Sequence, residues 1–261
     1  MSRITILTDF GTADGYVAAM KGVIADIAPG AVIDDASHDI PPGDVEAAAF
    51  ALSRYWRLYP AGTVHLVVVD PGVGSERRAI AARVDGRFFV APDNGVLTRV
   101  LDEAAADRIV SIEDPAYTRG HISATFHGRD IFAPAAAHLA RGTPLDALGP
   151  AVADPVRLPL PRPERTEGTI HAHVVAIDRF GNLITDVPGA WLSPGARVVI
   201  EGRDIGPLRR TYADVGPGQP LALVGSTGML EISVRDGSAA TMFDAARGTP
   251  VIIQEDVHAR G

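Results

Sequence analysis

The sequence predicts an α/β protein in two parts: an N-terminal layered domain with a mostly parallel sheet, and a smaller C-terminal domain of mainly antiparallel strands. Strand and helix signals alternate through the first half of the chain. Prolines then become frequent, as in the segment LPLPRP, and strand signals dominate the rest of the chain. We therefore expect an N-terminal domain over residues 1–150, a proline-rich linker over 151–166 and a C-terminal domain over 167–261.

The first half contains the pattern of a parallel sheet with covering helices. Residues 4–8 form a β-branched run, and apolar residues recur at helical spacing over 16–27 and, most clearly, over 44–59. The run 63–69 is almost continuously apolar, which is typical of a strand buried on both faces. The other elements expected here are strands at 31–33, 80–84, 88–91 and 109–112, and helices at 96–105 and 131–140.

The second half contains mostly strand signals. Apolar runs rich in valine, isoleucine and leucine are separated by glycine and proline turns, as in antiparallel β domains. The strands expected here are 170–177, 197–200, 221–224, 230–234 and 251–254, with one short helix at 239–246.

Composition and charge exclude several classes of protein. The chain has 261 residues, of which 46% are hydrophobic, so it is not intrinsically disordered. Because it has no cysteine, disulfide scaffolds, cysteine-bound zinc and thiol catalysis are excluded. A net charge of −8 without a run of basic residues argues against a nucleic-acid partner. We see no signal peptide and no apolar run of transmembrane length, and so expect a cytoplasmic protein with no membrane partner.

Two aspartates follow expected strands of the parallel sheet. Asp9 stands in TDFGTADG and Asp70 in VVVDPGVGSERR, and ligands of parallel sheets bind beyond the carboxyl ends of the strands. An acidic residue in that place often holds ribose hydroxyls, but both aspartates could equally cap turns. The glycines around them fit neither the phosphate loop nor the dinucleotide fingerprint. Arg77 and Arg78 are either a solvated pair or supply an ionic partner for Asp70.

Histidines offer two further candidates. His127 in TFHGRD is expected at the start of a helix, where the positive end of the helix dipole favours neutral imidazole; it is either a hydrogen-bond partner or without a role. Asp34, Asp35, His38 and Asp39 resemble a metal cluster but lack a recognised ligand spacing, so we predict no metal site.

Two segments of the second half have polar side chains at turns. Asn182 in IDRFGNLITDV presents an amide edge that suits adenine, and Ser226 lies in the turn of GSTGMLEISVRDGSAA. The alternative for each segment is a hairpin turn without a ligand.

Together, six segments resemble the S-adenosylmethionine (SAM) hydroxide adenosyltransferases, also called SAM hydrolases, which are relatives of the bacterial fluorinase and chlorinase. The segments are TDFGTADGYVAAMKG, VVVDPGVGSERRAI, APDNG, TFHGRDIFAPAAAHLA, IDRFGNLIT and GSTGMLEISVRDGSAA. They occur in order over nearly the whole chain. The resemblance implies a C-terminal domain that is β-barrel-like. It also implies a homotrimer, with SAM bound between one subunit's N-terminal domain and a neighbour's C-terminal domain.

The resemblance also implies roles for particular residues. Asp70, Arg77 and His127 match the set that surrounds a water in the hydrolases, whereas the halogenases have Tyr and Thr in place of the first two and Tyr in place of the third. The halogenases also have an extra loop for which this sequence has no room. Hydrolysis is therefore favoured over halogenation. The substrate-binding residues implied are Asp9 for ribose, Asn182 for adenine, and also Asp14, Asp178, Ser226, Glu231 and the backbone of Val234.

The chemistry fits an enzyme without metal or other cofactor. Water would attack the ribose C5′ of SAM, giving adenosine and methionine, and the leaving thioether is neutral and needs no general acid. Either Asp70 takes the proton of the water, or Arg77 stabilises the developing hydroxide while Asp70 and His127 orient it. A module that binds adenosine or SAM without catalysis is the alternative outside the enzymes.

Overall fold

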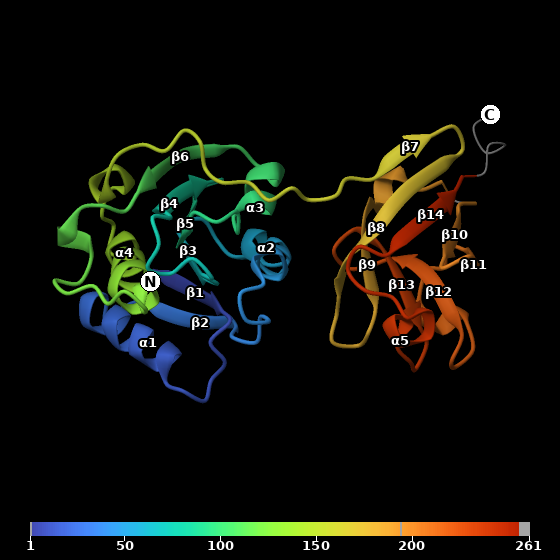
Figure 1. The fold of residues 1–261 in the computed structure, drawn as a ribbon, viewed down its shortest axis with the longest axis horizontal. Coiled ribbons are helices and arrows are strands. Elements are labelled where there is room, and N and C mark those ends of the chain that lie inside the picture. The colour runs from blue at the N-terminus through green and yellow to red at the C-terminus, as the bar shows by residue number, and fades with distance from the viewer. Residues whose placement is uncertain (1, 194, 256–261) are drawn as a thin grey trace. The chain divides into compact units, whose positions relative to one another are not determined.

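The structure is a computed structural model that describes residues 2–193 and 195–255. The chain divides into two compact units, Met1–Leu158 (unit 1) and Pro159–Gly261 (unit 2), shown in Figure 1. Among the residues described, no helix combines the length and the apolar character that crossing a membrane requires.

Unit 1 contains a six-stranded sheet in the order β2-β1-β3-β5-β4-β6. Four neighbouring strands, β2, β1, β3 and β5, are parallel, and β4 is antiparallel to both of its neighbours, so the prediction of a mostly parallel sheet is confirmed. The strands are β1 (Arg3–Thr8), β2 (Val32–Ser37), β3 (Val64–Val68), β4 (Ala79–Val84), β5 (Arg87–Pro92) and β6 (Ala106–Ser111).

The antiparallel part arises from a tight turn between β4 and β5. Asp85 and Gly86 form this turn with φ angles of 49° and 71°. Two positive φ angles are typical of the type I′ hairpin turn, whose twist matches that of the flanking strands and for which Asp-Gly is a favoured sequence. These two residues therefore fold β5 back onto β4.

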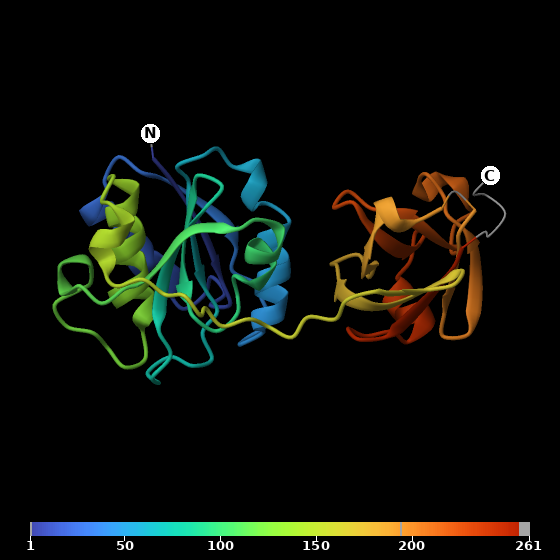
Figure 2. The same cartoon turned by 90° about the horizontal axis from the view of Figure 1, so that it is seen from above.

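Helices cover both faces of this sheet, as Figure 2 shows. On one face lie α1 (Tyr16–Ile27) and α4 (Ala133–Ala140); on the other lie α2 (Val45–Ser53) and α3 (Thr98–Glu103). Helix α1 buries Val17, Met20 and Ile24, whose spacing of three and four residues places them on one side. Each face therefore has its own apolar core.

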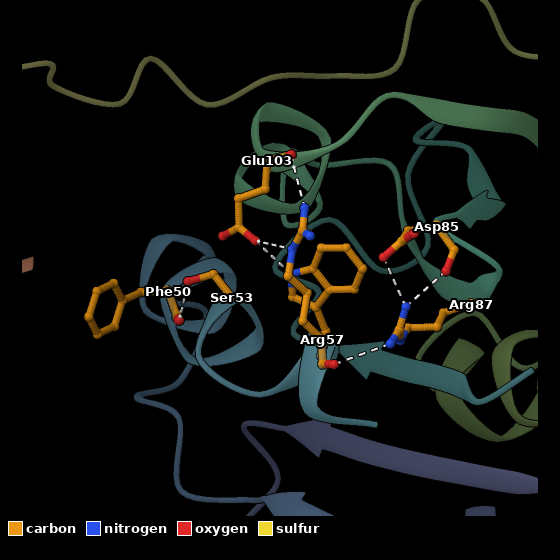
Figure 3. A network of polar contacts seen from close by, with 7 residues as sticks. Phe50, Ser53, Arg57, Asp85, Arg87 and Glu103 are labelled. Atoms are coloured by element: carbon orange, nitrogen blue, oxygen red, sulfur yellow. Dashed lines mark hydrogen bonds and ion pairs between the residues drawn. The ribbon is translucent and has the colours of Figure 1, made fainter. Parts of the chain in front are cut away.

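The predicted helix over 44–59 ends earlier than its periodicity suggested. Its α-helical part stops at Ser53, and a 3₁₀ turn, Trp56–Leu58, follows. Trp56 is fully buried and donates from Nε1 to Glu103, while the guanidinium of Arg57 lies 4.6 Å from the Trp56 ring. Arg57 also reaches Glu103, and Arg87 reaches the carbonyl of Arg57, as Figure 3 shows. Anchoring of Trp56 by α3 and β5 thus outweighs continuation of the helix.

The predicted helix over 131–140 begins with a π-helical turn, Gly128–Phe132, which continues directly into α4. Such turns are rare and frequently occur at functional sites. The remaining short helical turns are 3₁₀ helices at Pro115–Tyr117, Leu145–Leu148, Gly189–Trp191 and Tyr212–Asp214.

The first part of the segment predicted as a linker, 151–166, has hydrogen-bond partners in unit 1. The backbone N–H of Val156 donates to Asp93 at 2.8 Å, and that of Leu158 donates to Thr98 at 2.8 Å. Its end forms a short strand. The proline-rich composition did not reveal these backbone partners.

Unit 2 is an antiparallel sheet in the order β11-β10-β14-β8-β9-β13-β12, with β7 paired to β8. Its outer strands β11 and β12 contact each other, so the sheet nearly closes on itself and the predicted barrel-like domain is confirmed. Strands β7, β9 and β11 were not expected. The elements are β7 (Glu164–Thr166), β8 (Thr169–Ile177), β9 (Leu183–Pro188), β10 (Arg197–Ile200), β11 (Arg203–Pro207), β12 (Pro220–Val224), β13 (Met229–Val234), α5 (Ala239–Phe243) and β14 (Pro250–Gln254).

Candidate active site

The carboxyl ends of β1 and β3 meet where the strand order of the sheet in unit 1 reverses. The chain leaves β1 through α1 to reach β2 on one side, and then passes through α2 to β3 on the other side of β1. Thr8 and Val68 pair across the two parallel strands, so Asp9 and Asp70, which follow them, lie at the same edge. Reversals of this kind open a crevice in which parallel sheets bind ligands.

Arg77 joins Asp70 to His127. Its Nε donates to Oδ1 of Asp70 at 2.9 Å and its Nη2 donates to Oδ2 at 2.5 Å, which makes a two-point ion pair. The same Nη2 lies 2.7 Å from Nδ1 of His127. The side chains of Asp70 and Arg77 are only 5% and 11% exposed, so solvent weakens this pair little. The three residues that the resemblance implied are therefore in direct contact.

The contact with Arg77 determines the state of the His127 ring. A guanidinium can only donate, so Nδ1 of His127 accepts and the proton of the neutral ring is on Nε2. Burial and the charge of Arg77 lower the pKa of His127, while the nearby carboxylates raise it by less. The neutral imidazole predicted for this position is therefore favoured, chiefly because of burial and Arg77.

Two loops carry these residues, and they meet at Gly74. This glycine has a φ of +78°, and a Cβ atom placed on it would lie 2.5 Å from the carbonyl oxygen of Ala124. The loop after β3 and the loop before His127 therefore touch through backbone atoms. The guanidinium of Arg77 also lies 5.2 Å from the centre of the Phe132 ring, which packs it against the π-helical turn.

Asp9 is held by a third loop. Its Oδ2 accepts from the backbone N–H of Gly43 at 2.8 Å, and a Cβ on Gly43 would lie 3.6 Å from Cβ of Pro71, beside Asp70. Within residues 2–193 and 195–255, Oδ1 of Asp9 has no hydrogen-bond partner, so it is available to a ligand hydroxyl. Asp14 lies exposed in the turn before α1.

Three aromatic rings stand beside His127. Phe10, Tyr16 and Phe126 pack edge to face, with ring centres 5.2–6.0 Å apart. A Cβ on Gly128 would lie 3.4 Å from both phenylalanine rings, so this cluster reaches the start of the π-helical turn. These rings were not identified from the sequence. Their only signal was that two of them are neighbours of candidate site residues in the chain.

Two acidic residues of β2, Asp34 and Asp35, form ion pairs. His38 hydrogen-bonds Thr8 through Nδ1 at 2.8 Å, and its Nε2 lies 3.1 Å from Oδ1 of Asp35. Asp34 pairs with Arg3. In the described part of the chain, no three His, Asp or Glu residues are arranged to hold a metal ion.

In unit 2, Asp178 shapes the turn that carries Asn182. Its Oδ1 accepts from the backbone N–H groups of Phe180 and Asn182, and its Oδ2 accepts from the Asn182 side chain, all at 2.9 Å. Asn182 is thereby fixed and nearly buried, whereas the neighbouring Phe180 ring is 76% exposed. The turn thus presents an exposed aromatic ring beside an oriented amide.

Glu231 is the centre of a second polar group in unit 2. Its Oε1 accepts from the hydroxyl of Tyr212 at 2.6 Å and from that of Ser233 at 2.9 Å. The hydrogen bond to Glu231, together with burial and the charges of Glu231 and Asp178, raises the pKa of Tyr212 to about 12. Asp178 and Glu231 therefore lie in one neighbourhood. Tyr212 was missed because it lies far from both in the sequence.

Of the two remaining residues, one lies in the turn before β13 and the other is the last residue of β13. Ser226 is exposed in the turn between β12 and β13, and a Cβ on the adjacent Gly225 would lie 2.5 Å from Oε2 of Glu231. Val234 ends β13, and its carbonyl accepts from the N–H of Gly237 at 3.1 Å. Glu231 thus links the Ser226 turn to the polar group around Tyr212.

Comparison with known proteins gives a consistent match over both units. The SAM hydroxide adenosyltransferase N-terminal domain matches residues 4–149, and the C-terminal domain of the same family matches residues 172–252. An (R)-S-adenosyl-L-methionine hydrolase of Thermus thermophilus is 44% identical over 96% of this chain and 99% of its own. A fluorinase of Actinoplanes is 29% identical over 96% of both chains. The crystal structure of an uncharacterized conserved protein from Thermotoga maritima superposes with a TM-score of 0.91 and 36% identity, covering 97% of this chain and 100% of the other.

Proposed function

Because the chain belongs to the SAM hydroxide adenosyltransferase family, we infer that it is an enzyme that hydrolyses SAM to adenosine and methionine. A water oxygen attacks the ribose C5′, the C5′–S bond breaks, and the sulfonium sulfur leaves as the neutral thioether of methionine. The observation that carries the mechanism is the contact of Arg77 with both Asp70 and His127.

Among these three residues, Asp70 is the one that can accept the proton of the water. Arginine stays protonated in proteins. Nδ1 of His127 already accepts from Arg77, and the proton of the neutral ring is on Nε2. The carboxylate of Asp70 has lone pairs beyond those that Arg77 takes. We expect this proton to move late, because a water becomes much more acidic as its bond to carbon forms.

Arg77 and His127 act as donors to the attacking oxygen. Nε2–H of His127 and the guanidinium of Arg77 are fixed by their mutual hydrogen bond before substrate arrives. Donors held in advance stabilise developing negative charge without reorganising during the reaction. No general acid is required, because the thioether leaves without a proton.

The family resemblance supports the substrate-binding roles. We propose that Oδ1 of Asp9, which has no hydrogen-bond partner among the described residues, accepts from a ribose hydroxyl, and that the amide of Asn182 binds the adenine edge. We propose Asp14, Asp178, Ser226, Glu231 and the backbone of Val234 as further contacts to SAM.

We further propose that the enzyme is a cytoplasmic homotrimer that uses SAM as substrate and requires no other cofactor. In this arrangement, SAM binds between unit 1 of one subunit and unit 2 of its neighbour. The family resemblance supports this proposal.

Product analysis tests the function directly. Purified protein, treated with a chelator, is incubated with SAM in the presence and absence of chloride or fluoride, and nucleosides are separated by chromatography. We expect adenosine and methionine in equal amounts under every condition. A halogenated nucleoside would indicate a halogenase, unchanged SAM a binding module, and activity that returns only with a divalent cation a metal-dependent mechanism.

A further inference from the structure

Asp130 is a fully buried carboxylate in the π-helical turn of unit 1 and follows His127 by three residues in the sequence. Its Oδ1 accepts from Nε of Arg129 at 2.7 Å and its Oδ2 from Nη2 of the same arginine at 2.9 Å. Oδ2 also accepts from the backbone N–H of Ser123 at 2.9 Å, and Nε of Arg119 lies 3.5 Å from Oδ1. A buried charge is costly unless it is paired, so this arrangement holds the carboxylate in one place.

The backbone of Asp130 closes the same loop from both ends. Its carbonyl accepts from the N–H of Arg119 at 2.8 Å, and its N–H donates to the carbonyl of Phe126 at 3.2 Å. One residue therefore fixes the start, the middle and the end of the loop 119–126, which leads directly to His127. This loop also touches the Asp70 loop, through Ala124 against Gly74.

Asp130 contributes to the electrostatics of the His127 ring as well. The charged groups that act on this ring are Arg77 and Asp70 from the loop after β3, and Asp130 from the π-helical turn. Arg77 and burial lower the pKa of His127, and the two carboxylates oppose them. Loss of the Asp130 charge alone would therefore lower this pKa further.

We propose that Asp130 is a positioning residue for the hydrolysis: it holds the His127 loop against the Asp70 loop, so that the His127 ring keeps its hydrogen bond with Arg77. This role rests on the proposed function and acts through His127 rather than on the substrate. It extends the site beyond the residues that surround the attacking water.

The test is a double-mutant cycle between Asp130→Asn and His127→Ala, with SAM hydrolysis by the parent protein measured alongside. Asn keeps the size of the side chain and removes its charge. We expect Asp130→Asn to lower kcat at least about tenfold, to change KM for SAM by less than about twofold, and to move the acidic limb of the pH profile to lower pH. In the His127→Ala background, the same substitution should change kcat less than about twofold.

Asp146→Asn is the control, because Asp146 forms an exposed ion pair with Arg108 and should keep the kcat of the parent. Multiplicative losses in the cycle, or an unmoved acidic limb, would show that Asp130 serves stability alone. If Asp130→Asn fails to fold, Arg119→Gln is the second variant, because it removes the guanidinium that lies 3.5 Å from Asp130 and is half exposed. Its loss of kcat should also depend on the presence of His127. A loss of kcat that is the same with and without His127 would overturn the proposal. A parent protein that leaves SAM intact refutes the function, whereas an active parent with normal variants refutes only the role of Asp130.

Discussion

At the scale of single residues, the site depends on which of two adjacent arginines faces Asp70. Arg77 does, while Arg78 donates to Asp93 at 2.8 Å and to Asp154 at 2.8 Å. Side chains of successive residues in an extended chain point to opposite sides, so only one of the two arginines can face Asp70. Arg77 is thereby shared between a carboxylate and an imidazole, which fixes both.

Substitutions of the two aspartates should separate binding from chemistry. Asp70→Asn removes the proton acceptor and should lower kcat at least ~10²-fold, with affinity for adenosine near that of the parent. Asp9→Ala removes a contact made equally in the ground and transition states, and should mainly raise KM. Steady-state kinetics and adenosine titration measure both effects. Near-normal kcat in Asp70→Asn would place the base elsewhere, and loss of adenosine binding by a folded variant would make Asp70 a binding residue.

At the scale of elements, catalysis should depend on the contact between the two loops at Gly74. Gly74→Ala places a Cβ 2.5 Å from the Ala124 carbonyl oxygen, so the loops must separate and His127 must move from Arg77. We expect kcat to fall at least about tenfold, since the donors are then misplaced. Gly62→Ala is the matched control: its φ is +84°, but a Cβ there meets nothing within 4 Å. Equal losses of activity in the two variants would attribute the effect to backbone strain rather than to the loop contact.

The buried strand β3 should make the stability of unit 1 sensitive to acid. His65 is fully buried and hydrogen-bonded to Thr5 at 2.8 Å, and burial, with the charge of Arg87, lowers its pKa to about 3. The unfolded chain binds a proton near pH 6.5 and the folded chain does not, so stability falls as pH drops from about 6.5 toward 3. The expected loss at pH 5 is roughly 2 kcal/mol.

Urea unfolding at several pH values measures this loss. His65→Asn, which can still exchange a hydrogen bond with Thr5, should flatten the pH dependence, whereas replacing the exposed His121 by Gln should leave it as in the parent. An equal slope in His65→Asn and the parent would assign the acid sensitivity to other groups.

At the scale of the whole molecule, the proposed interface site predicts complementation between inactive subunits. Asp70→Ala disables the chemistry in unit 1, and Asn182→Ala disables binding in unit 2. If each site combines unit 1 of one subunit with unit 2 of its neighbour, mixed trimers contain some sites with both parts intact. Activity should return after subunits exchange, as measured by adenosine release. Mixed oligomers without activity would place the whole site within one chain.

The sequence by itself determined the fold class and most elements. An element that is buried on one side shows apolar residues at regular spacing, and a strand that is buried on both sides shows a continuous apolar run. Thus α1 lies where the periodicity predicted it, and the buried run before Asp70 is β3. It also identified the family through segments whose residues are neighbours in the chain. The apolar periodicity and the family segments are local features of the sequence, so they can be recognised without knowledge of the three-dimensional packing.

Only the tertiary structure decided which distant side chains meet. The contact of Arg77 with His127, the loop closure by Asp130 and the bond between Tyr212 and Glu231 join residues whose mutual orientation depends on how strands and loops pack. The early end of α2 has the same origin, since Trp56 is held by Glu103 from another helix. The local secondary-structure propensity of a segment does not reveal such partners. The contacts between them contribute free energy only when the sheet and its covering helices are assembled.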